Sequence, residues 1–140
     1  MQECNETITV LNRRYDPDRG LDTWIPTVLH GVSWFNKIAA TVTQDGLKAA
    51  NTAIVRIPEG ADAGERVYLA PPEYKAAESV SGAYTLARGD IIARGDITGG
   101  TAGSITPAQA KAQSEDVLTI ISVTDSTRRR HGAHRKVVLA

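Results

Sequence analysis

Short runs of β-branched and apolar residues recur along the chain, and they constrain its fold more than any other feature of the sequence. Glu6 to Asn12 (ETITVLN) alternates between polar and apolar residues, and Thr52 to Ile57 (TAIVRI) is a further run that a proline stops. Asp116 to Thr124 (DVLTIISVT) is the most β-branched run of all. Such runs, bounded by turn residues, are typical of strands. The pattern therefore predicts a sheet protein.

The aromatic residues gather in a second pair of extended runs. Trp24 to Leu29 and Val32 to Val42 read as two strands that meet around His30-Gly31, and both tryptophans and the one phenylalanine lie within them. We expect this region to anchor the core. Adjacent residues of a regular strand point to opposite faces, so Trp34 and Phe35 cannot both face inward. One of these two residues is a candidate interface residue.

One helix is indicated by its start signal. Thr106-Pro107-Ala108-Gln109 combines a capping hydroxyl, a proline at the first helical position and a glutamine three residues after the cap. Good helix formers follow, which predicts a helix over residues 107–113. Elsewhere RVYLAPPEY indicates a short strand ended by Pro71-Pro72, and HRKVVLA indicates a last strand.

These elements predict an all-β protein, an antiparallel β-barrel or sandwich of about six to eight short strands with one short helix near 107–113. The 140 residues form one domain, 1–140, with a loose N-terminus at 1–5, a flexible glycine-rich loop at 98–105 and a basic loop at 126–136. The single cysteine, Cys4, excludes an intrachain disulfide. With neither a signal sequence nor an apolar span, we expect a soluble protein made in the cytoplasm.

A pentapeptide, ARGDI, occurs twice between Leu86 and Gly100. In an extended chain one face would hold Ile91, Ala93, Gly95 and Ile97, and the other Asp90, Ile92, Arg94 and Asp96. This alternation predicts a half-buried strand with one apolar and one mostly charged face. No Lys-Ser or Lys-Thr pair follows the glycines, so a phosphate-binding glycine loop is not indicated.

Each copy of the pentapeptide also contains Arg-Gly-Asp, the tripeptide that adhesion receptors read on an exposed loop. The second copy is the closer of the two to a loop, because it runs into a glycine-rich stretch. We expect a flexible loop that contains Gly95, Asp96, Gly99, Gly100 and Gly103.

Charge is unevenly distributed although the net charge is zero. No acidic residue follows Asp125, and the basic residues there could contact an acidic neighbouring subunit or nucleic acid. The candidate contact residues are Arg128, Arg129, Arg130, His131, Arg135 and Lys136. No recognition helix or stacking aromatic lies near them, so contact with nucleic acid would be limited to its backbone. A solvated basic hairpin is the alternative.

No catalytic signature is present in the sequence. There is no Gly-x-Ser-x-Gly, and His131 and His134 lack two further ligands at the spacing that a zinc site needs. The carboxylate pairs fit turns and helix ends better than a shared cleft. We therefore expect no enzyme activity, no catalytic residue, no cofactor and no metal.

Taken in order, these segments resemble a known family. The resemblance lies in ITVLNRRYDPDRGLDTWIPTVLHGVSWF, QDGLKAANTAIVRIP, RGDIIARGDI, the short helix and DVLTIISVTDS, and it extends from about Ile8 to about Val123. The family consists of small proteins encoded among the head and neck genes of tailed phages and prophages. The chain is also similar in size, β content and strand order to head-closure proteins, the connectors or stoppers below the portal of long-tailed phages.

The resemblance implies a non-enzymatic virion structural protein at the head–tail interface, in which a ring of about six or twelve copies closes the head and docks the tail. Its implied partners are further copies of itself, portal or adaptor proteins on the head side, and the tail terminator or tail tube on the other. Packaged DNA is a further candidate partner, through its backbone only, and no membrane is involved. A tail-terminator or completion protein, a minor capsid protein, a small nucleic-acid-binding β-barrel and an adhesion module remain alternatives.

Overall fold

The computed structural model describes residues 6–18, 20–43, 46–64, 66–77, 82–98, 105–114, 116–126 and 134–140; for 36–43, 46–51 and 126 it describes the backbone alone. The elements in chain order are β1 (Glu6–Asp16), β2 (Leu21–Thr43), β3 (Gly46–Pro58), β4 (Val67–Tyr68), α1 (Pro71–Ala76), β5 (Ala83–Tyr84), β6 (Ile91–Arg94), α2 (Pro107–Gln113), β7 (Val117–Ser126) and β8 (His134–Leu139). The expected strands at the two ends of the chain correspond to β1 and β8.

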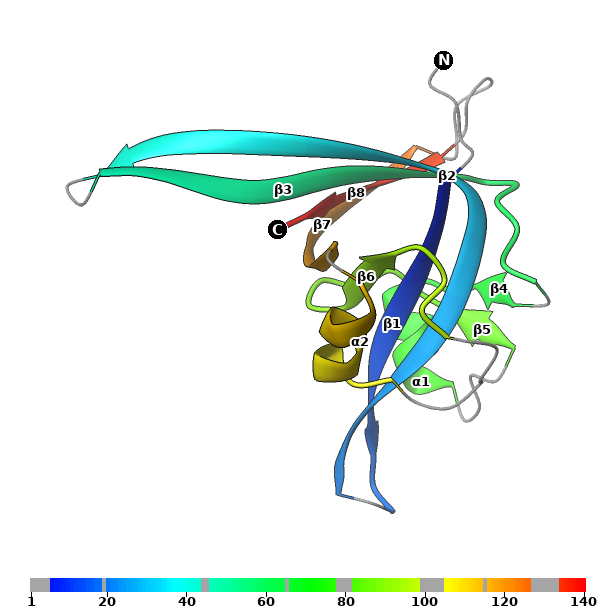
Figure 1. Cartoon of the computed structure of the whole chain (residues 1–140). Helices are drawn as coiled ribbons and strands as arrows, with labels where there is room; N and C mark the ends of the chain where they lie inside the picture. The colour runs from blue at the N-terminus through cyan, green and yellow to red at the C-terminus, as the bar shows by residue number, and fades with distance from the viewer. Residues whose placement is uncertain are drawn as a thin grey trace.

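Six strands close into a barrel in the order β1-β2-β3-β8-β7-β6, and every neighbouring pair is antiparallel (Figure 1). Closure gives each strand a partner on both sides, which removes the free edges of an open sheet. The predicted all-β class is confirmed, and of the two architectures the barrel is the one formed. β4 and β5 pair separately as a short parallel sheet.

The barrel interior is filled mainly by aliphatic residues at alternate positions of the strands. Ile8 and Val10 of β1, and Val137 and Leu139 of β8, are fully buried there. Burial alternates over Val137–Leu139 of β8, whereas Ile8 to Asn12 of β1 are all buried because this stretch of β1 is covered on both faces. The aromatic region contributes to this core through Leu29 and Val32, which are fully buried, while Trp34 packs against the core and is only partly buried.

A second, smaller core lies outside the barrel wall, under α2. Leu11 of β1 and Ile91 of β6 pack there against Ile105 and Ala110. The helix begins as predicted, because the Thr106 hydroxyl accepts from the Gln109 N–H and the Gln109 side chain accepts from the Thr106 N–H. The expected helix at 107–113 is confirmed.

Because α2 covers its outer side, β6 is buried on both faces. Ile92 points into the barrel and is fully buried, while Ile91 lies in the second core. The expected half-exposed strand with a mostly charged face is therefore wrong for this segment. A sequence alternation test cannot detect a helix that covers the second face.

A single strand, β2, replaces the two strands expected on either side of His30-Gly31. Gly31 has a φ of +80°, and the β1–β2 register slips by one residue there. A glycine at positive φ accommodates such a bulge without ending the strand. Before the bulge β2 pairs with β1, and from Ser33 onward it pairs with β3.

Beyond the barrel, β2 and β3 continue as a two-stranded hairpin that projects away from the other elements (Figure 1). β8 pairs with β3 only as far as Ala53, whereas β2 and β3 pair on to Thr43 and Gly46. We call residues 37–43 and 46–52 the β2–β3 ribbon. Its seven residue pairs give it a length of roughly 20 Å at about 3.4 Å per residue.

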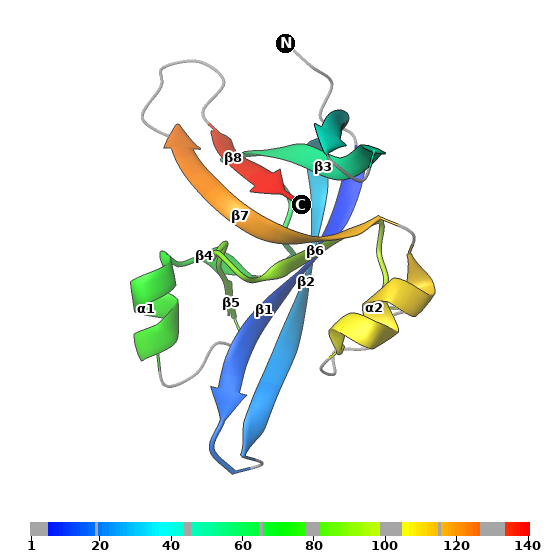
Figure 2. The same cartoon turned by 90° about the vertical axis from the view of Figure 1, so that its left-hand side faces the viewer.

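A second short helix, α1, begins where a strand was expected to end. Pro71 and Pro72 occupy its first two positions, where the missing N–H groups cost nothing. Figure 2 shows α1 and α2 on opposite sides of β1 and β2. The position of α1 matters because α1 forms one wall of a cavity.

Candidate functional site

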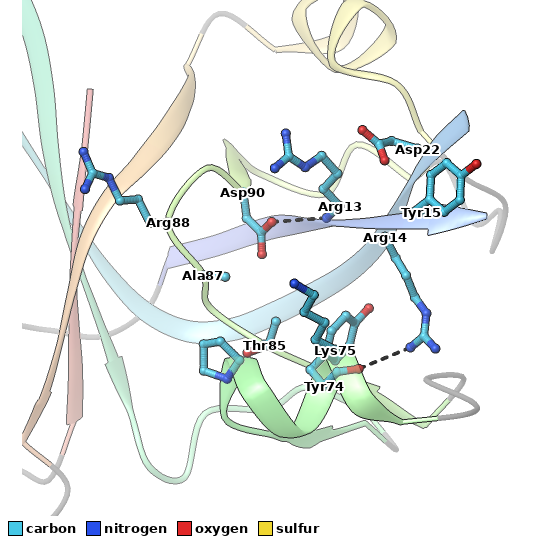
Figure 3. Close-up of a pocket in the computed structure, with 11 residues that line it drawn as sticks. Arg13, Arg14, Tyr15, Asp22, Tyr74, Lys75, Thr85, Ala87, Arg88 and Asp90 are labelled. Carbon is cyan, nitrogen blue, oxygen red and sulfur yellow. Dashed lines mark hydrogen bonds between the residues drawn. The ribbon is translucent and has the colours of Figure 1, made fainter. Parts of the chain in front are cut away.

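A polar cavity of about 500 Å³ opens beside α1, and we call it the α1 cavity (Figure 3). Three segments far apart in sequence line it: the β1–β2 hairpin, α1, and the stretch before β6. The polar side chains in its lining are Arg13, Arg14, Tyr15, Asp22, Tyr74, Lys75, Thr85, Arg88 and Asp90. Its size is in the range of small-molecule sites.

A buried hydrogen-bond network joins β1 to the stretch before β6. The Asn12 side chain donates to the Thr85 carbonyl (2.6 Å) and to Asp90 Oδ2 (2.9 Å), and its Oδ1 accepts from the Thr85 N–H (3.2 Å). The other Asp90 oxygen accepts from the Arg13 N–H (3.2 Å). Asn12 is fully buried and Asp90 is only 5% exposed, so these bonds are shielded from water. The network fixes Asp90 and Thr85 in the cavity wall.

The environment of Asp90 favours its protonated form. Burial raises the pKa of Asp90, although hydrogen bonds from Asn12 and from the Arg13 N–H oppose the shift. A carboxyl group with a raised pKa in a cavity is a common feature of functional sites, but buried structural networks produce it too.

Two hydroxyl groups in the cavity residues lack a hydrogen-bond partner within the described part of the chain. They are Tyr74 Oη and Thr85 Oγ1, and both residues are at least nine-tenths buried. Burial also raises the pKa of Tyr74. Buried polar groups in proteins are nearly always hydrogen-bonded, so an unpaired pair beside one cavity indicates capacity for water or a ligand.

Arg14 holds α1 against the barrel. Its guanidinium donates to the carbonyls of Tyr74 (3.3 Å) and Ala77, and it lies 5.9 Å from the centroid of the Tyr74 ring. A cation at the C-terminal end of a helix satisfies carbonyls that have no partner in the helix. Arg14 therefore positions the wall that α1 contributes to the cavity.

The first Arg-Gly-Asp copy forms a turn in which the arginine is exposed and the aspartate is buried. Gly89 has a φ of +95° and its N–H donates to the Ile120 carbonyl, and the Asp90 N–H donates to the Ala87 carbonyl. Since the Asp90 carboxyl group is buried by the network described above, this copy does not present an acidic group to a receptor.

The second copy is held by interactions of its own. Arg94 forms ion pairs with Glu6 (2.8 Å) and Asp116 (3.7 Å) and lies over the Trp34 ring. Gly95 has a φ of +90° and donates to the Thr7 carbonyl.

Asp96 is the exposed member of this copy. It accepts from both the N–H and the hydroxyl of Thr98, which lowers the pKa of Asp96. With Arg94 engaged inside the fold, the geometry does not favour adhesion.

The predicted contact residues are only partly described. Arg128, Arg129, Arg130 and His131 lie outside the described residues, as do Gly99, Gly100 and Gly103 of the expected flexible loop. Their roles stay predictions.

Arg135 faces the inside of the barrel, because its register partner Ile57 is buried there. Its guanidinium lies 3.6 Å from the Tyr68 ring centroid and its Nε lies 3.8 Å from Asp125. This position leaves Arg135 little surface for a partner. Lys136 is half-buried on the outer face, in register with Arg56 and Thr124.

Exposed apolar residues gather on the outer barrel wall where the ribbon begins, and we call them the root patch. Phe35 is 48% exposed and pairs in register with Ile54, which pairs with Val138. Cross-strand register partners share a face of the sheet. Ile121, which is 44% exposed, precedes Ser122, the next partner of Val138. The expectation that Trp34 and Phe35 face opposite ways agrees with this arrangement.

The described residues contain no group of three or more His, Cys, Asp or Glu side chains that could hold a metal ion. Among the same residues, no helix is long and apolar enough to cross a membrane.

Comparison with known proteins identifies the family alone. A family model described as a family of unknown function (DUF6751) matches residues 3–138, and the chain belongs to this family. No curated protein and no solved structure matches the chain.

Proposed function

We propose that this DUF6751 protein is a non-enzymatic structural protein of a long-tailed phage virion. In this proposal it forms a ring at the neck that closes the head and docks the tail. Its partners are other copies of itself, portal or adaptor proteins on one side and the tail terminator or tail tube on the other. The packaged DNA is a candidate contact inside the ring.

The observation that carries the proposal is the β2–β3 ribbon. Within the described part of the chain no third strand pairs with residues 37–43 or 46–51. A two-stranded ribbon is marginally stable alone in water, and the outer edges of such a ribbon can accept a further strand. A protein that retains such an extension on a closed barrel gains from a partner that covers it.

The root patch supports the same conclusion. Apolar residues that are exposed together on a sheet face are typical of contact surfaces, and Phe35 and Ile121 are each more than two-fifths exposed. A ribbon on one side of a subunit and an apolar barrel wall at its base are different surfaces. Two different surfaces are what a heterologous contact needs, and such contacts form a ring when the rotation between subunits closes the circle.

The experiment that tests the proposal measures mass by light scattering. The purified protein is examined alone and with portal and neck assemblies of the phage that encodes it, at low and at high salt. We expect the protein to join those assemblies as a ring. A protein that stays monomeric, ignores the assemblies and binds free DNA instead would contradict the proposal and favour a small nucleic-acid-binding barrel.

A ribbon-shortened variant separates the ribbon from the rest of the fold. In this variant an Asn-Gly turn joins Lys37 directly to Thr52, a register pair, because Asn-Gly favours a two-residue hairpin turn. The matched control is Lys111→Ala, at an exposed position of α2. We expect the shortened variant to fold but not to join the assembly, and the control to join it normally.

A further inference from the structure

We infer that the α1 cavity binds a phosphate group, supplied by free phosphate, by a nucleotide or by the backbone of a nucleic acid. The inference does not rest on ring formation, because the β2–β3 ribbon contributes no residue to the cavity. It rests on the charges around the cavity and on the groups in its wall.

Four cationic residues line the cavity: Arg13, Arg14, Lys75 and Arg88. Within the described part of the chain none of the four forms an ion pair with a carboxylate, and Arg14 uses its guanidinium on backbone carbonyls. The lining holds two more cations than carboxyl groups, and this excess of positive charge creates a potential that attracts an anion.

Two arginines of the barrel are compensated by carboxylates. Arg94 lies between Glu6 and Asp116, and Arg135 lies between Asp125 and the Tyr68 ring. Among the described residues no carboxylate lies within ion-pair distance of the four cations of the cavity lining, so their charge is available to an anion.

The two carboxyl groups in the lining do not cancel this charge. Asp90 is held by the Asn12 side chain and the Arg13 N–H, so its oxygens are directed at those donors. Asp22 belongs to β2, on the other side of Tyr15 and Arg14 from α1 in Figure 3. Two carboxyl groups against four cations leave the lining positive even when both are ionised.

The wall also supplies hydrogen-bonding capacity. The hydroxyl oxygens of Tyr74 and Thr85 have no partner among the described residues and are closed to solvent in this wall, so they can donate to a bound phosphate only after the atoms that cover them move. Figure 3 shows the Lys75 amino group in the space between α1 and Asp90, where it can pair with a bound anion. Phosphate fits this combination better than a carboxylate does, since it carries more charge and more acceptor oxygens.

The test is calorimetric titration of the whole protein with three probes: inorganic phosphate, deoxyadenosine monophosphate and a short DNA duplex. The variant Arg13→Ala/Lys75→Ala removes two cations of the cavity. Lys111→Ala is the matched control, because Lys111, like Lys75, lies in the last turn of a short helix but far from the cavity. Circular dichroism confirms that each variant is folded.

We expect phosphate affinity to fall about tenfold or more in the double variant and to stay within about twofold in the control. Tighter binding of the nucleotide or of the duplex, lost in the same variant, identifies the source of the phosphate. The inference is overturned if no probe binds, or if the double variant and the control weaken binding equally. The ribbon-shortened variant is expected to bind phosphate normally, so failure of this inference and failure of the proposed function are distinguishable.

Discussion

The barrel and the ribbon share β2 and β3, but the edges of these two strands are paired differently in the two regions. Within the barrel β2 has β1 and then β3 as partners, and β3 has β8 on its other side. In the ribbon, among the residues that the structure describes, the same two strands pair with each other and with no third strand. A closed sheet gives every strand a hydrogen-bonded neighbour on both sides, whereas each strand of a two-stranded extension has a neighbour strand on one side only. We therefore expect stability to depend on residues of the barrel and assembly to depend on residues of the ribbon, so that mutation can separate the two.

The largest effect is expected from the barrel core. Ile92→Ala removes a fully buried side chain, which should lower the free energy of unfolding by about 2–4 kcal/mol. Ile121→Ala is the matched control, because Ile121 is 44% exposed on the outer wall and should cost less than about 0.5 kcal/mol. Urea denaturation of both variants measures the difference. Equal losses would show that the outer wall contributes to stability as the core does.

A loss of about 2–3 kcal/mol is expected for Asn12→Ala. This change leaves the Asp90 carboxyl group and the Thr85 backbone without their buried partners. Asp96→Asn, in the second ARGDI copy, should cost less than about 0.5 kcal/mol because Asp96 is exposed. Thermal unfolding of the two variants distinguishes them. Similar stabilities would contradict the structural role assigned to the Asn12–Asp90 network.

A smaller effect on stability, but a large one on assembly, is expected for Phe35→Ser. Phe35 is 48% exposed, so the free energy of unfolding should change by less than about 1 kcal/mol. If the root patch is a subunit contact, the variant should need several-fold more protein to reach the same mass in light scattering. An unchanged assembly would remove the root patch from the contact surface.

The smallest effect concerns pH. Burial raises the pKa of Asp90 above its ordinary 3.8, so the folded state holds this proton more tightly than the unfolded chain. Its contribution to stability is therefore greatest below pH 3.8 and is lost as the pH rises through the raised pKa. Asp90→Asn should remove this dependence.

The pH prediction is tested on the difference in unfolding free energy between the wild type and Asp90→Asn. This difference should become less favourable to the wild type as the pH rises above 3.8. Asp96 should show the opposite sign, because its pKa is lowered and its contribution is lost as the pH falls. Urea denaturation across this pH range gives both curves. A difference that grows with pH for Asp90 would contradict the raised pKa.

The sequence predicted those strands and helices whose characteristic residue patterns lie within a few consecutive positions. The alternating run Glu6 to Asn12 predicted β1, the stretch HRKVVLA indicated β8, and the Thr106–Gln109 capping box predicted α2. The start of α1 was missed because Ala70 offers no capping side chain and Pro71-Pro72 also ends strands. Continuity of β2 depended on the bulge at Gly31, which the sequence alone does not distinguish from a turn.

The candidate site could not be predicted, because it forms only when distant segments meet. Arg13, Tyr74 and Asp90 belong to three elements, and none of them has a local motif that marks a cavity. Arg135 shows the related difficulty: a charged residue in a basic segment reads as a surface residue, yet its register places it inside the barrel against Tyr68. Burial of a charge in this way depends on partners that a single sequence does not reveal.

The most direct test of the account is amide hydrogen exchange of the full protein, compared between dilute monomer and assembled ring. We expect the backbone amides of residues 37–43 and 46–52 to exchange fast in the monomer and to be strongly protected in the ring. Barrel amides should be protected equally in both states. Ribbon amides that are already as protected as the barrel in the monomer, or that stay unprotected in the ring, would contradict the claim that the ribbon is completed by a partner.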